Sequence, residues 1–166
     1  MNDVRTAMLP GTFDPPTNGH INIIRRAAGL YGKLYVVVAD NIYKKCLFSV
    51  DERLGMLREI LSDIGNIEVV SWQGLVVDFA REHSVSVMLR GVRALADFSY
   101  EFELAMTNRQ IYPELETLFI PTDPNYFILR SSAIKELAMF GADITKMVPP
   151  LVARRLSQKY KTEGEC

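Results

Sequence analysis

The residues best suited to chemistry lie near the N-terminus, in the stretch Gly11-Thr12-Phe13-Asp14-Pro15-Pro16-Thr17-Asn18-Gly19-His20. An apolar run, Val4–Leu9, precedes this stretch, and a helical pattern, Ile21–Tyr31, follows it. The prolines and glycines at the joint favour a turn and let the backbone approach a ligand closely. His20 then lies at the start of a helix, where unpaired backbone N–H groups attract phosphate. The pattern predicts a phosphate-handling site.

A histidine at this position could also do no more than cap the helix. The two commonest phosphate loops do not explain the stretch, because the chain has no G-x-x-x-x-G-K-[ST] motif and no G-x-G-x-x-G after the first apolar run.

Further polar residues follow the other apolar runs of the chain. Lys44 and Lys45 come after the second run, Arg90-Gly91-Val92-Arg93 after the fourth, and Leu129–Ser132 after the fifth. Ligands of parallel sheets bind beyond the carboxyl ends of the strands, so we expect these residues to converge on one crevice with Thr12 and His20.

Each of these residues also has an ordinary structural interpretation. The lysine pair could simply be solvated. Arg90, at the end of a buried strand, needs an anionic partner, which could be a ligand or a structural carboxylate. Arg93 could pair with Asp97, one turn further on, and Ser131 or Ser132 could be the N-cap of a helix.

Cations, hydroxyls and one imidazole together suit a reaction whose transition state carries negative charge on phosphoryl oxygens. Such sites act by positioning and electrostatics. The chain shows neither a Cys/His cluster with zinc spacing nor a G-x-S-x-G motif. We therefore expect no metal ligands from the protein.

Apolar runs and helical patterns alternate along the chain, and Ser49 and Glu52 are spaced as a capping box. This alternation predicts an α/β, single-domain Rossmann-like fold: a five-stranded parallel sheet with helices on both faces. We expect the domain to span residues 1–161 and a flexible C-terminal tail to span 162–166. The expected strands are Val4–Leu9, Lys33–Ala39, Ile67–Ser71, Val85–Leu89 and Thr117–Pro121. The expected helices are Ile21–Tyr31, one opening at Ser49, Leu75–His83, Ala94–Tyr112, Ser131–Phe140 and one from Pro149/Pro150 to Tyr160.

The composition is that of an ordinary globular chain: 166 residues, 48% hydrophobic and 23% charged, with a formal net charge of -1. The charge argues against a nucleic-acid partner. No apolar run approaches the roughly 20 residues that span a bilayer, and the N-terminus lacks a signal-peptide pattern. The two cysteines, Cys46 and Cys166, suggest no disulfide framework. We expect a cytoplasmic protein with no nucleic-acid or membrane partner.

Thr17-Asn18-Gly19-His20 resembles the (H/T)-x-G-H signature of the nucleotidyltransferase superfamily. The stretch Arg90-Gly91-Val92-Arg93-Ala94-Leu95-Ala96-Asp97-Phe98 is more specific and resembles the bacterial phosphopantetheine adenylyltransferase family. That likeness covers nearly the whole chain, and its other parts are Gly11–Pro15, Lys44-Lys45, Gly65–Val69, Tyr100-Glu101, Asn108-Arg109, Ser131-Ser132 and Ile134-Lys135-Glu136.

The resemblance implies transfer of the adenylyl group of ATP to 4′-phosphopantetheine, giving dephospho-coenzyme A and pyrophosphate in coenzyme A biosynthesis. The acceptor phosphate would attack in line, without a covalent intermediate. The resemblance also implies Mg²⁺ bound with ATP, coenzyme A as a feedback inhibitor, and a homohexamer.

The same resemblance assigns roles to residues. His20, Thr12, Lys44 and Arg90 would be catalytic. The residues implied to contact ATP are Thr12, Phe13, His20, Gly91, Val92, Arg93, Glu101, Tyr126, Phe127, Ile128, Leu129, Arg130, Ser131 and Ser132. The residues implied to contact the acceptor are Thr12, Lys44, Leu75, Val76, Arg90 and Asn108.

The chain departs from the family pattern in two places. Arg130 stands where the family usually has a serine, and Tyr126 stands where the family often has tryptophan. Two other functions are open: a sister nucleotidyltransferase acting on nicotinamide mononucleotide or on an alcohol phosphate with CTP, and a nucleotide-binding module without catalysis.

Overall fold

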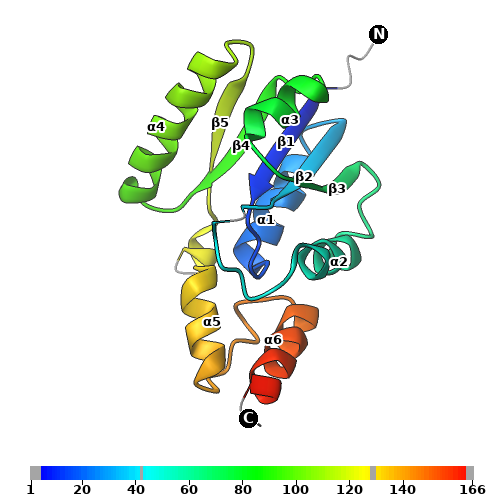
Figure 1. Ribbon diagram of the computed structural model, residues 1–166, viewed down its shortest axis with the longest axis vertical. Helices are drawn as coiled ribbons and strands as arrows, with labels where there is room; N and C mark the ends of the chain where they lie inside the picture. The colour runs from blue at the N-terminus through cyan, green and yellow to red at the C-terminus, as the bar shows by residue number, and fades with distance from the viewer. Residues whose placement is uncertain (1–4, 42, 128–129, 164–166) are drawn as a thin grey trace.

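A five-stranded parallel sheet in the order β3-β2-β1-β4-β5 organises the fold, as the sequence predicts (Figure 1). The computed structural model describes residues 5–41, 43–127 and 130–163. Its strands are β1 (Thr6–Gly11), β2 (Lys33–Ala39), β3 (Ile67–Trp72), β4 (Val87–Val92) and β5 (Glu116–Pro121). Its helices are α1 (Asn18–Ala28), α2 (Val50–Ile60), α3 (Val76–Glu82), α4 (Leu95–Ile111), the 3-10 turn η1 (Pro124–Tyr126), α5 (Ser131–Met139) and α6 (Pro150–Glu163).

Side chains of alternate residues along the strands enter two different cores, because successive residues of a strand point to opposite faces. On β2, Val36 and Val38 pack with α1 and α2, whereas Val37 packs with α3. The sheet is therefore covered on both faces, which explains why β2 is almost entirely apolar.

No helix among the described residues is long and apolar enough to cross a membrane.

The C-terminal helices α5 and α6 form a packing unit of their own beyond the carboxyl ends of the strands, separate from the two cores of the sheet (Figure 1). Their apolar residues, including Ile134, Val152 and Leu156, pack with Phe48 and with Met56 of α2. This unit brings the N-terminus of α5 toward the turn that follows β1.

Several element boundaries differ from the sequence-based expectation. β1 continues through Pro10 to Gly11, and β4 continues to Val92, so Arg90 lies inside a strand rather than after it. α6 extends to Glu163 and so includes the first two residues of the expected tail; residues 164–166 lie outside the described part of the chain. The Ser49–Glu52 capping box is confirmed.

Candidate active site

A cavity of about 540 Å³ opens at the carboxyl ends of β1 and β4, where the strand order reverses. This is the position at which open parallel sheets bind ligands. The residues expected from sequence that line it are Thr12, Phe13, His20, Lys44, Arg90, Gly91, Arg93, Glu101, Tyr126, Arg130, Ser131 and Ser132.

His20 is the third residue of α1, and its ring is held by the N-cap residue Thr17. The backbone N–H of Thr17 donates to His20 Nδ1 at 3.0 Å, while the Thr17 hydroxyl accepts from the backbone N–H of His20. Because Nδ1 accepts this bond, the neutral ring carries its proton on Nε2. Burial, Arg93 and Arg90 lower the pKa of His20 to about 4. At neutral pH the ring is thus an uncharged hydrogen-bond donor.

Phe13 reinforces this geometry. Its ring packs edge-on against the His20 ring with the centroids 5.1 Å apart. Its φ of 50° is uncommon for a bulky residue and marks a tight turn between β1 and α1. The turn therefore combines a constrained backbone with a fixed histidine.

The cations of the site are paired in two different ways. Lys44 Nζ donates to Thr12 Oγ1 at 3.3 Å from an exposed loop. Arg90, by contrast, makes a bidentate pair with Glu101 at 2.6 and 2.7 Å and also donates to the carbonyl of Pro10 at 2.7 Å. Of the two partners considered for Arg90, the structure thus shows a carboxylate of the chain itself.

Arg93, which directly follows β4, makes the ion pair with Asp97 that its structural interpretation predicts. Arg93 Nε donates to Asp97 at 3.1 Å, one turn further on. Both ion pairs therefore join this edge of the site to α4.

The N-terminus of α5 faces the same cavity. Its N-cap is Arg130, with an extended backbone and no side-chain capping bond, so the expectation that Ser131 or Ser132 is the N-cap is wrong. The Ser131 hydroxyl instead donates to the carbonyl of Pro15 at 3.0 Å. Helix ends leave their first N–H groups without helical partners, and the side chain of the N-cap residue Arg130 does not cap them.

Comparison with known proteins identifies the family. A model of the cytidylyltransferase-like family matches residues 8–137. Phosphopantetheine adenylyltransferase from Dictyoglomus turgidum is 48% identical over 95% of this chain and 98% of its own length. The enzymes of that name from Thiobacillus denitrificans and Streptomyces coelicolor are 47% and 44% identical, over 94% and 95% of this chain and 98% and 99% of their own lengths. The chain belongs to the phosphopantetheine adenylyltransferase family.

The fold has a more distant likeness among solved structures. A candidate nicotinate-nucleotide adenylyltransferase from Vibrio parahaemolyticus superposes with a TM-score of 0.65 at 15% identity, covering 96% of this chain and 93% of that one. At this identity the likeness supports the Rossmann-like fold alone.

Some residues implied by the family resemblance do not line the cavity. Leu75 caps the N-terminus of α3, and Asn108 is on α4, where its amide contacts Met88 Sδ at 3.9 Å. Ile128 and Leu129 lie outside the described residues. The other implied residues that do not line the cavity are Val76, Val92 and Phe127.

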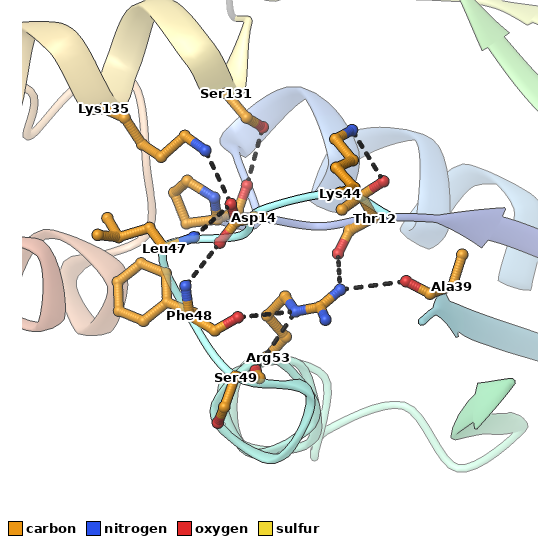
Figure 2. Close-up of polar contacts among 11 residues, drawn as sticks. Thr12, Asp14, Ala39, Lys44, Leu47, Phe48, Ser49, Arg53, Ser131 and Lys135 are labelled. Carbon is orange, nitrogen blue, oxygen red and sulfur yellow. Dashed lines mark hydrogen bonds and ion pairs between the residues drawn. The ribbon is translucent and has the colours of Figure 1, made fainter. Parts of the chain in front are cut away.

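The sequence analysis assigned no role to three charged residues that hold the site together: Asp14, Arg53 and Lys135 (Figure 2). Arg53 is only 2% exposed, and its guanidinium donates to backbone carbonyls, among them those of Thr12 at 2.8 Å and Phe48 at 3.2 Å. A signal was present, because Arg53 precedes Leu57 and Leu61 at helical spacing and so falls on the buried face of α2.

Proposed function

We propose that this chain transfers the adenylyl group of ATP to 4′-phosphopantetheine, giving dephospho-coenzyme A and pyrophosphate. Family membership supports the reaction, and one observation in the structure supports the site. A single cavity gathers a neutral histidine donor, Lys44, three arginines and the N-terminus of α5. This donor set suits the crowded negative charge of two phosphorylated substrates.

In this proposal the acceptor phosphate attacks the α-phosphorus of ATP in line, the bond from that phosphorus to the bridging oxygen breaks, and pyrophosphate leaves. The Nε2–H group of His20 donates a hydrogen bond to an α-phosphate oxygen as negative charge builds on that oxygen. It does so without changing its protonation state, because Thr17 holds Nδ1 as an acceptor.

The acceptor phosphate would lie between Thr12 and Lys44, whose side chains already contact one another. Arg90 would contribute the guanidinium N–H groups that Glu101 and Pro10 do not use. The pantetheine arm would run from the cavity toward Leu75, Val76 and Asn108.

ATP would bind across Gly91–Arg93 and Glu101, with Tyr126 as an aromatic wall. Its β- and γ-phosphates would accept hydrogen bonds from the first turn of α5, at Ser131 and Ser132. Arg130 lines the cavity at the N-cap of that helix, so we assign it a phosphate contact. The remaining residues assigned to ATP are Thr12, Phe13, Phe127, Ile128 and Leu129.

Mg²⁺ would arrive on the phosphates of ATP. No group of three or more His, Cys, Asp or Glu in the described part of the chain could hold a metal ion. The carboxylates that line the cavity are each paired with a cation: Asp14 with Lys135, Asp97 with Arg93, and Glu101 with Arg90. The described residues thus offer no ligand cage for Mg²⁺, and we assign the ion no protein ligand.

We also propose that the chain assembles as a homohexamer, with coenzyme A as a feedback inhibitor in the same cavity. Large exposed apolar side chains on α4 and β5 support an assembly, because monomers rarely expose such patches. These side chains are Leu95, Phe98, Tyr100, Phe102, Met106, Ile111 and Leu118. The free thiol of Cys46 suits a cytoplasmic location.

The decisive measurement is pyrophosphate release from ATP and Mg²⁺ with each of three acceptors: 4′-phosphopantetheine, nicotinamide mononucleotide and glycerol phosphate. We expect release with phosphopantetheine alone. Release with another acceptor would keep the mechanism and change the substrate. ATP binding without release would favour the binding-module alternative.

A further inference from the structure

The carboxylate of Asp14 joins three segments that lie far apart in the sequence (Figure 2). Asp14 belongs to the turn after β1. It accepts the backbone N–H groups of Leu47 and Phe48, both at 2.9 Å, from the loop that carries Lys44. It also accepts Lys135 Nζ from α5 at 2.7 Å.

The charge of Asp14 makes this junction specific. Asp14 is 4% exposed. Burial by itself would raise the pKa of this carboxyl, but Lys135 and the N–H groups of Phe48 and Leu47 together lower it. A buried carboxylate that loses one of several donors is left with an uncompensated charge, so the three segments are held in one arrangement.

The two partner segments carry opposite halves of the proposed site. Lys135 lies four residues after Ser131 on the same face of α5, and Ser131 docks on Pro15, the neighbour of Asp14. Leu47 and Phe48 follow Lys44 by three and four residues in the same loop. The carbonyl of Phe48 also accepts a hydrogen bond from Arg53 Nε. Asp14 thus connects α5 directly to the loop that carries Lys44.

We propose that the Asp14–Lys135 pair is a positioning device that couples the two substrate sites, so that ATP phosphates bound at α5 strengthen binding of the acceptor phosphate at Lys44. The inference rests on the two-substrate reaction proposed above. Phosphate at the helix N-terminus favours the docked position of α5, and through Asp14 this position favours the placement of Lys44 beside Thr12. Coupling between two sites must be reciprocal.

The test measures the dissociation constant of 4′-phosphopantetheine by calorimetry with and without a non-hydrolysable ATP analogue. The ratio of the two constants is the coupling factor, which for coupled sites is typically about 5- to 150-fold. We expect a factor in this range for the unmodified protein, a factor near 1 for Lys135→Met, and recovery in Lys135→Arg, which keeps the ion pair.

Lys159→Met is the matched control. Lys159 lies on α6, makes an ion pair of 2.9 Å with Glu52, and is 35% exposed compared with 25% for Lys135. It also packs over the Phe48 ring, so it controls for loss of local packing. We expect Lys159→Met to retain the coupling factor.

Three outcomes would overturn this inference and leave the proposed function standing. They are a coupling factor near 1 in an unmodified protein that turns over phosphopantetheine, a coupling factor retained in Lys135→Met, or an equal loss of coupling in Lys159→Met. An unmodified protein that neither binds phosphopantetheine nor releases pyrophosphate with it would overturn the proposed function as well. The two failures are therefore distinguishable.

Discussion

The two helices that flank the cavity, α1 and α4, are held in different ways. α1 buries Ile21, Ile23 and Ile24 against the sheet, whereas no residue of α4 is buried within the single chain. Both helices serve the site, because α1 carries His20 and α4 carries the carboxylates that pair with Arg90 and Arg93. In Figure 1, α4 stands at the outer edge of the molecule beside β5.

This difference teaches that the two halves of the site depend on different packing. The histidine half is fixed by the core of the chain itself and by the Thr17 cap. The arginine half is fixed through a helix whose apolar side chains, such as Phe102 and Met106, face outward. The arginine half therefore rests on a helix that the described chain itself does not bury.

The largest expected effect breaks the histidine half. In His20→Asn the amide oxygen can replace Nδ1 as the acceptor of the Thr17 N–H, but the variant lacks the Nε2 donor. We expect kcat to fall about 10²- to 10³-fold, as on loss of one transition-state donor, while the affinity for ATP changes less. His20→Gln, which can place an amide N–H near the Nε2 position, should recover part of the activity. Equal losses in ATP binding and in turnover would contradict the role of His20.

The second expected effect concerns the same histidine and is a change in the free energy of unfolding with pH. The pKa of His20 is lowered from 6.5 to about 4, so between these values the unfolded chain binds a proton that the folded chain does not. The free energy of unfolding should therefore fall as the pH falls from 6.5 toward 4, by at most about 3 kcal/mol. Denaturant titrations at several pH values in this range should show that the free energy of unfolding changes less with pH in His20→Asn. If it changes equally with pH in both proteins, other groups cause the dependence.

How much of the fold could be predicted follows from the range of the interactions. The parallel sheet was predictable because apolar runs, helical spacing and the Ser49 capping box are local patterns. The N-cap of α5 was not, because the choice between Arg130 and Ser131 depends on how Ser131 docks on Pro15, more than a hundred residues earlier.

The site divides in the same way. His20 and Lys44 lie in motifs that can be read along the chain, so both could be predicted to lie at the cavity that they line. The partner of Arg90 could be narrowed only to a ligand or a carboxylate, because the choice of Glu101 requires the position of α4 relative to β4. Asp14 and Arg53 were missed because their contacts join segments that the sequence does not bring together.

The third effect tests whether a second copy covers α4. Phe102 is 48% exposed on α4, and Phe140 is 76% exposed just after α5, outside the apolar patch of α4 and β5. Phe102→Glu should break the assembly, since a buried charge at an interface hot spot costs on the order of 2 kcal/mol or more. Light scattering should show a smaller particle for Phe102→Glu and an unchanged one for Phe140→Glu. A monomeric unmodified protein, or two variants that behave alike, would contradict the role of α4.

The smallest effect concerns Lys44, which belongs to neither helix. Lys44 is exposed and makes one long bond, to Thr12, so its removal leaves both packed halves in place. We expect Lys44→Ala to raise the KM for phosphopantetheine by about tenfold or less, in keeping with the loss of about 1 kcal/mol from an exposed charged contact, and to leave the KM for ATP nearly unchanged. Its neighbour Lys45 does not line the cavity, so Lys45→Ala is the matched control. If both lysine variants raise the KM equally, the loop acts only through its overall charge. If Lys44→Ala alone does so, the acceptor phosphate is held by one exposed cation of the cavity, whereas the histidine is held in place by the core of the chain.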